Sequence, residues 1–306
     1  MATMAKESVS VAIPPHKERR EISWSAFIWI GPALVLMLLF FIYPMIQTVV
    51  YSFQNKLSTA FVGFKNYQTI FTDPNMLLVL KNNLIWLVLG TILTVGLGLT
   101  VAVLVDRVKI ERVIKSALFI PMALSLVAAG VIWRFVYEYA APGQPQVGLL
   151  NAFLGLFHVP AQAWFENEAV NNFALIAIYV WIWTGFCMVI LSAALKGIPD
   201  DVIEAAKIDG ASRLTMFWRV MVPMISPTLG VVTTTMIINI LKIFDVIYVN
   251  TGGNYNTSVV AMEFYNQYFN FQNYGLGSAL AVVLTIAILP VMYINIRRLR
   301  AQEGQR

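Results

Sequence analysis

The chain has 306 residues, of which 58% are hydrophobic and 12% are charged, and its formal net charge at pH 7 is +5. Ordinary soluble domains are about 45–50% apolar and about 25% charged, so this composition excludes a typical soluble enzyme. The single cysteine and two widely separated histidines exclude a disulfide framework and a Cys/His metal site.

Six apolar segments predict an all-α, polytopic membrane protein with six transmembrane helices. About 20 apolar residues are needed to cross the hydrocarbon core, and lipid cannot satisfy open backbone groups, so each segment is expected to be helical. The segments are 26–50, 84–105, 116–137, 173–195, 229–249 and 278–296. Residues 1–25 are expected to form a cytoplasmic tail, 26–296 the six-span domain and 297–306 a second cytoplasmic tail.

The basic residues lie mostly on one side of this six-span arrangement. Both tails, the second connection (106–115) and the fourth connection (196–228) carry four Lys or Arg residues each, whereas the opposite connections hold only Lys56, Lys65 and Lys81. Cytoplasmic loops carry an excess of Lys and Arg, so both termini are expected in the cytoplasm. We interpret the basic charge as a topology signal, and no nucleic-acid partner is expected.

The last outer connection, 250–277, is rich in aromatic residues. They are consistent with an aromatic belt at the membrane surface or with a docking surface for an external partner. The chain contains no Gly-x-x-x-x-Gly-Lys-Ser/Thr pattern, so ATP-driven transport would require another chain to hydrolyse the ATP.

The fourth connection, 196–228, is predicted to form two short helices separated by a turn. Pro199 and the two aspartates after it suit a helix start, Gly210 suits a left-handed helix stop, and Ser212 can cap the next helix. Pro223 and Pro227 are expected to interrupt that helix before the fifth span. The second helix is expected to place four apolar residues on one face: Leu214, Phe217, Trp218 and Met221.

The spacing Glu204-Ala205-Ala206-x3-Gly210-x9-Val220-x-Val222-Pro223 resembles the "EAA" loop of ABC importer permeases, with Val at both large aliphatic positions. In that family the short helix fits into a groove of the ATPase subunit. The resemblance implies a non-enzymatic subunit without a cofactor of its own, because ATP and Mg²⁺ would be bound by the partner ATPase. The implied ATPase-coupling residues are Glu204, Ala205, Ala206, Asp209, Gly210 and Pro223.

Further motifs along the chain are similar to the maltose-type sugar permeases. They are Gly31-Pro32, Tyr43-Pro44, 63–67 (GFKNY), 119–121 (FIP), Trp133, 148–151 (GLLN), Phe244-Asp245 and 251–253 (TGG). The family often continues with Gly-Pro where this chain has Asn254 and Tyr255, which leaves the local turn shape open. The resemblance implies a type I ABC importer permease fold and the first of two permease subunits.

The same resemblance implies a set of partners. We expect a heterodimer with a second permease subunit in a bacterial inner membrane, bound to two ATPase subunits and to an external sugar-binding protein. A small carbohydrate is the expected solute.

Polar residues of the fifth predicted span are candidates for a solute site. Thr235, Asn239 and Lys242 are spaced to share one helix face, and Asp245 could pair with Lys242. A structural ion pair with interhelical hydrogen bonds explains them as well, but the resemblance favours solute binding. Trp181 and Trp183 are stacking candidates or packing residues, and Trp183 is included in the predicted site.

Three functions other than sugar import are compatible with a polytopic membrane protein. A permease of the same family could carry a glycerol-phosphate-like solute, although more cavity arginines would then be expected. In an ion-driven secondary transporter or channel, acidic residues would be expected within the spans. A membrane-embedded enzyme lacks support, because no intramembrane His cluster, paired carboxylates or Ser–His arrangement is present.

Overall fold

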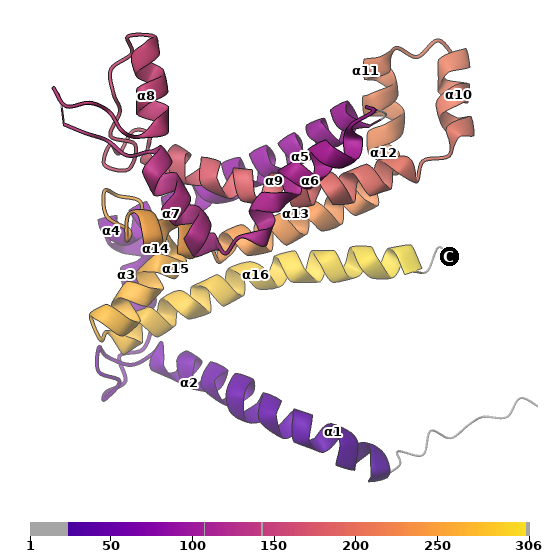
Figure 1. The fold of residues 1–306 in the computed structure, drawn as a ribbon. Helices are drawn as coiled ribbons and strands as arrows, with labels where there is room; N and C mark the ends of the chain where they lie inside the picture. Colours follow the sequence, from indigo (N-terminus) through magenta and orange to yellow (C-terminus); the bar gives the residue numbers. More distant parts are fainter. Residues whose placement is uncertain (1–23, 107, 142, 304–306) are drawn as a thin grey trace, which may run out of the picture. The chain divides into compact units, whose positions relative to one another are not determined.

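The computed structural model describes residues 24–106, 108–141 and 143–303, and their regular structure is helical apart from an isolated bridge between Gln54 and Phe61 (Figure 1). The α-helices are α1 Trp24–Met37, α2 Tyr43–Tyr51, α3 Lys65–Thr72, α4 Pro74–Ile85, α5 Thr91–Val105, α6 Glu111–Phe119, α7 Leu126–Val136, α8 Leu149–Leu156, α9 Asn171–Lys196, α10 Asp200–Ile208, α11 Arg213–Met216, α12 Val222–Met224, α13 Ser226–Leu241, α14 Asp245–Asn250, α15 Val260–Tyr265 and α16 Tyr274–Glu303. The all-α class is confirmed.

The chain divides after Gln47 into two compact units. The described part of the first unit contains α1, a π-helical turn at Leu38–Ile42 and the start of α2. Together with the rest of α2 these residues form an apolar helix, Ile28–Tyr51, of 24 residues, which is long enough to cross a membrane. Most of the predicted N-terminal tail lies outside the described residues, whereas residues 297–303 of the predicted C-terminal tail continue α16.

Three more unbroken helices of the described chain have the length and composition of membrane spans: Pro74–Val105, Asn171–Lys196 and Tyr274–Arg297. Two bent pairs bring the possible number of spans to six. In one pair, Glu111–Ala123 meets Leu126–Val136 at 104°, and in the other, Arg213–Met224 meets Ser226–Leu241 at 74°. The prediction of a single helix over 116–137 is therefore wrong.

Local chemistry accounts for the bends. In the first pair, Pro121 lies in the short 3₁₀ turn that ends α6, and the Ser125 hydroxyl caps α7 by accepting from the Ala128 N–H at 3.1 Å. In the second pair, Pro223 and Pro227 flank the bend, as the sequence predicts. The expected helix over 229–249 is also wrong, because α13 ends at Leu241 and α14 begins only at Asp245.

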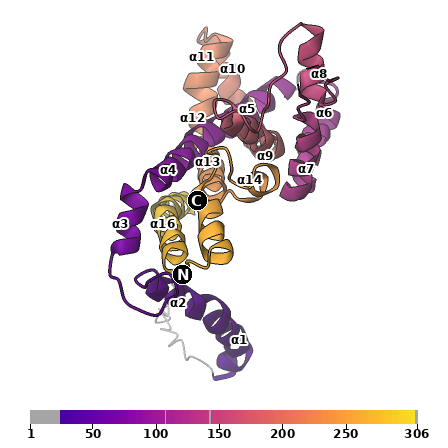
Figure 2. The same ribbon diagram turned by 90° about the vertical axis from the view of Figure 1, so that its left-hand side faces the viewer.

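Helix α9 is the centre of the packing in the second unit. It contacts α5, α6, α13 and α14, and 14 of its residues are buried (Figure 2). A Cβ added at Gly185 would lie only 2.0 Å from the Leu118 carbonyl oxygen, so glycine permits α6 to approach α9 closely. Close approach through small residues is how helices associate in lipid, where no hydrophobic force drives them together.

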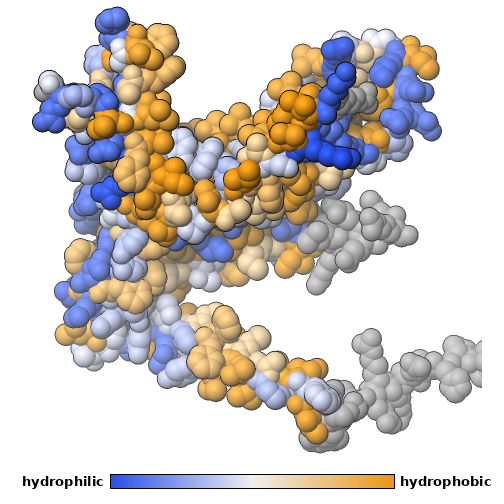
Figure 3. All heavy atoms as spheres, in the orientation of Figure 1, coloured by the Kyte–Doolittle hydropathy of each residue, from blue (hydrophilic) through white to orange (hydrophobic). Residues whose placement is uncertain are grey.

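Hydrophobic side chains cover much of the visible surface over α6, α7 and α9 (Figure 3). Hydrophilic side chains gather at the end of the second unit that carries α10 and α11. This distribution fits a body that crosses a bilayer and exposes the α10–α11 end to water.

Candidate functional site

The break between α13 and α14 lies beside a small cavity. Helix α13 ends where the Lys242 N–H bonds to the carbonyls of Asn239 and Ile240, and residues 242–244 are not helical. Non-helical backbone at membrane depth is tolerated only where it is buried in protein or lines a cavity. Broken helices also supply solute sites in other transporters.

This cavity has a volume of about 230 Å³ and brings together four of the five predicted solute-binding residues. Its lining comprises Leu126, Tyr179, Trp183, Asn239, Lys242, Ile243 and Asp245. The Trp183 indole N–H is buried and has no hydrogen-bond acceptor among the described residues, so it is a free donor at the cavity. The predicted residues thus form one polar and aromatic cluster.

Thr235 does not line this cavity. Its hydroxyl donates to the Val231 carbonyl of its own helix at 2.9 Å, a common use of threonine within a helix. Lys242 lies beyond the end of α13. The prediction that it shares a helix face with Thr235 and Asn239 is therefore wrong. Lys242 and Asp245, both within the described residues, make no ion pair with each other, which contradicts the alternative of a structural ion pair, and both groups line the cavity.

Sequence reasoning missed Tyr179, which is buried on α9 and lines the same cavity. Its position four residues before Trp183 on one helix is the signal that could have found it. The two rings lie 6.1 Å apart. Trp181 instead lines an apolar cavity with Leu97 and Pro121 and meets the Trp133 ring at 5.7 Å, so it packs away from the polar cluster.

The predicted helix–turn–helix at 196–228 is present as α10 and α11. Gly210 adopts φ +78°, the left-handed conformation predicted for it, and the Ser212 hydroxyl accepts from the Thr215 N–H at 3.2 Å. Two aspartates occupy the first turn of α10, where they meet the positive end of the helix dipole. We call residues 199–221 the hairpin.

The outward surface of the hairpin carries the EAA residues. Glu204, Ala205, Asp209 and Gly210 are exposed, whereas Ala206 is half-buried. Ile208, at the end of α10, is 86% exposed, an unusual degree for an isoleucine that has no partner within the chain. Pro223 lies at the bend before α13 and fixes where the hairpin leaves the membrane-spanning part.

The prediction that four apolar residues share one face of the second helix is wrong. A π-helical turn at Phe217–Met221 inserts an extra residue per turn and changes the direction of the side chains that follow. Phe217 and Met221 pack against the core, whereas Leu214 and Trp218 are 69% and 59% exposed. The hairpin therefore has an inner apolar contact and a separate outer apolar surface.

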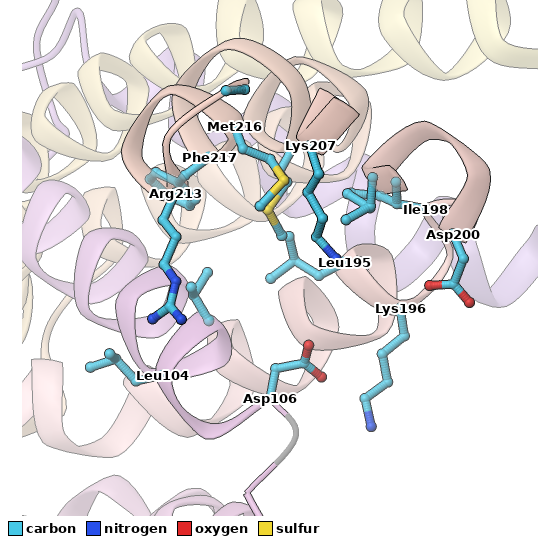
Figure 4. A pocket seen from close by; sticks show the side chains of 14 residues that line it. Leu104, Asp106, Leu195, Lys196, Ile198, Asp200, Lys207, Arg213, Met216 and Phe217 are labelled. Carbon is cyan, nitrogen blue, oxygen red and sulfur yellow. The ribbon is translucent and has the colours of Figure 1, made fainter. Parts of the chain in front are cut away.

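A cavity of about 890 Å³ separates the hairpin from the ends of α5 and α9 (Figure 4). Lys207 and Arg213 extend from the hairpin into this space, and Asp106 and Lys196 border it from the membrane-spanning helices. The hairpin is thus attached to the core through Phe217 and Met221 and stands apart elsewhere.

A charged cluster ties the start of α6 to the end of α9, where the hairpin segment begins. The Glu111 carboxylate accepts from Lys115 and from Lys196, each at 2.5 Å, and Lys115 also donates to Ser192. Lys196 is the last residue of α9, so this cluster fixes the position from which the hairpin departs.

Comparison with known proteins agrees with this architecture. Residues 94–300 match the family described as binding-protein-dependent transport system inner membrane component. The osmoprotective compounds uptake permease protein GgtC of Synechocystis is 52% identical, covering 91% of this chain and 100% of that protein. The alpha-glucoside transport system permease protein AglF of Rhizobium meliloti is 40% identical, covering 91% of this chain and 83% of that protein.

Solved structures match in fold. A chain of a bacterial alginate ABC transporter superimposes with a TM-score of 0.76 at 20% identity, covering 89% of this chain and 92% of that chain. A chain of the MetNI methionine ABC transporter gives 0.51 at 18% identity, covering 75% and 98%. The expected type I ABC importer permease fold is confirmed, and the chain belongs to the family of binding-protein-dependent transport system inner membrane components.

Proposed function

We propose that this chain is one permease subunit of an ATP-driven importer for a small neutral sugar or glycoside. The observation that carries the proposal is the cavity at the α13–α14 break, where Trp183, Asn239, Lys242 and Asp245 converge. Amide, ammonium and carboxylate groups bind sugar hydroxyls, and an aromatic ring covers the apolar face of a sugar. Family membership favours this function over an ion-driven transporter.

The charge of the cavity supports a neutral solute. Its lining holds one basic and one acidic side chain, Lys242 and Asp245, so no excess of positive charge is available for a phosphate ester. The relative named for alpha-glucosides points to the same class of solute. A glycerol-phosphate-like solute is the less favoured candidate.

The hairpin supports docking to an ATPase subunit. Its exposed Glu204, small Ala205 and protruding Ile208 form a narrow surface that suits a groove of a partner protein. We infer that two ATPase subunits bind ATP and Mg²⁺, that a second permease completes the pathway, and that an external sugar-binding protein delivers the solute. The basic connections support an orientation with both termini in the cytoplasm of a bacterial cell and this chain in its inner membrane.

Reconstitution tests the proposal directly. The chain, its second permease, the ATPase and the binding protein are assembled in liposomes, and uptake of labelled trehalose, a neutral disaccharide, is measured with and without ATP. We expect uptake that needs ATP and all four components. Sugar uptake by vesicles that lack the ATPase, or transport of glycerol phosphate in place of sugars, would contradict it.

A further inference from the structure

A second polar cavity, of about 430 Å³, lies at the C-terminal end of α7, whereas Leu126 at the N-terminal end of α7 lines the α13–α14 cavity. It shares no lining residue with the α13–α14 cavity. Its walls are the C-terminal end of α7, the connection after it and the end of α14 with the loop that follows. Its lining comprises Arg134, Phe135, Tyr137, Glu138, Tyr139, Ala163, Trp164, Phe165, Glu166, Asn250 and Tyr255. The volume falls within the range of small-molecule sites, roughly 300–1,000 Å³.

The aromatic wall of this cavity is held rigidly by Asn151, which is 1% exposed. The Asn151 amide donates to the Glu138 and Gln162 carbonyls at 2.9 and 3.0 Å, and its oxygen accepts from the Trp164 indole N–H at 3.0 Å. The Trp164 ring lies 5.5 Å from that of Tyr137. A wall fixed in this way needs little reordering when a ligand binds.

The cavity contains an unsatisfied polar group. Asn250 is 8% exposed, and its amide N–H donates to the Val246 carbonyl at 2.8 Å. Its side-chain oxygen is buried and accepts no hydrogen bond from any described residue. A buried acceptor without a donor is costly, and a ligand hydroxyl would satisfy it.

Charged side chains surround the opening. Arg134, Glu138 and Glu166 are exposed, and none of them makes an ion pair or side-chain hydrogen bond within the described residues. Carboxylates accept from sugar hydroxyls and the guanidinium donates to them, so the opening can bind a polyhydroxylated ring without a preferred charge.

The Tyr255 ring is presented at this opening by a strained loop. Tyr255 and Asn256 adopt φ of +54° and +59°, a conformation uncommon for residues other than glycine. Two buried asparagines hold it, since Asn171 donates to the Tyr255 carbonyl and Asn82 to the Asn256 carbonyl, both at 2.7 Å. Residues in strained backbone conformations that the surrounding structure maintains are concentrated at binding and switching sites.

We propose that this cavity is an access site that binds a sugar ring before the solute reaches the α13–α14 cavity. The inference rests on the proposed function. The pocket is concave and rigid and contains an unsatisfied buried acceptor. These features suit a small ligand better than a protein partner, which would bind to a flatter surface. Under the proposed topology, the cavity faces the outer side, from which the solute arrives.

The test compares two neighbouring glycine substitutions. Tyr255→Gly removes a lining ring at a left-handed position, whereas Asn256→Gly makes the same kind of substitution at the neighbouring left-handed position, which does not line the cavity. Glu166→Gln removes one charge from the opening without changing the backbone. Binding of trehalose to the assembled transporter, in lipid nanodiscs and without the binding protein, is measured by saturation-transfer NMR.

We expect Tyr255→Gly and Glu166→Gln to weaken trehalose binding at least threefold, and Asn256→Gly to match the wild type. Identical binding by all three variants overturns the access site, as does a loss of affinity for the binding protein alone, which would assign the cavity to protein docking. A wild-type transporter that takes up no sugar would instead overturn the proposed function, and the access site with it.

Discussion

Gly98 of α5 lies against Cys187 of α9 so closely that a Cβ at position 98 would be 2.5 Å from the Cys187 Cβ and 3.1 Å from the Met188 backbone nitrogen. Backbone and Cβ atoms cannot move aside as the end of a flexible side chain can. The α5–α9 pair therefore constrains the part of α9 that leads toward the hairpin, and the glycine is needed for its geometry.

Gly98→Ala should destabilise the protein. Overpacking of this kind typically costs about 1–3 kcal/mol, because the helices must shift apart. The matched control is Gly96→Ala on the same helix, since a Cβ at position 96 has no neighbour within 4 Å. Thermal unfolding in detergent should show a lower Tm for Gly98→Ala alone. Equal Tm values for the two variants would contradict the observed helix spacing.

Topology can be tested by cysteine labelling with little background, because the single native cysteine, Cys187, is buried. Asn256, between α14 and α15, and Lys207, on α10, are both exposed. These helices lie at opposite ends of the second unit (Figure 1). Cysteine placed at 256 should react with an impermeant reagent in intact cells, and cysteine at 207 only after permeabilisation. The reverse pattern would contradict the orientation inferred from the basic residues.

The features that the sequence predicts correctly have local causes. The cap at Ser212 and the left-handed Gly210 each follow from one residue and its neighbours. The break at Lys242–Phe244 could not be predicted, because it contains neither proline nor glycine and lies inside the largely apolar segment 229–249, which is long enough for one span. It depends on tertiary packing, where Gly130 of α7 lets Val249 and Asn250 of α14 approach closely. Such contacts override local helix propensity.

Asn239→Ala should weaken sugar transport, whereas Thr235→Ala should not. The Asn239 amide lines the cavity, but the Thr235 hydroxyl is already bonded to its own helix. A net hydrogen bond is worth about 0.5–1.5 kcal/mol, so the half-saturating trehalose concentration should rise roughly twofold to tenfold for Asn239→Ala. Equal effects of the two substitutions on uptake by reconstituted transporter would place both residues in a structural role.

The sharpest prediction concerns the coupling of ATP hydrolysis to transport. ATPase closure must reach the membrane helices through an element that contacts both. The hairpin is joined to the core through Phe217 and Met221, while its Glu204 surface is exposed and can contact a partner. Glu204→Lys reverses the charge offered to the ATPase, and Gly210→Pro cannot adopt φ +78°. Both variants should insert and bind sugar normally but lose ATP-driven uptake.

The controls separate backbone shape from general damage to the hairpin. No atom lies within 4 Å of a Cβ at position 210, so a substitution there is limited by the backbone alone. Asparagine tolerates the left-handed conformation, and Gly210→Asn should therefore retain most of the uptake, while Gly210→Ala should lose part of it at a cost of about 1 kcal/mol. ATP hydrolysis stimulated by the loaded binding protein should follow the same order. Wild-type uptake by a Glu204→Lys, Gly210→Pro double variant would show that coupling runs through another part of the chain.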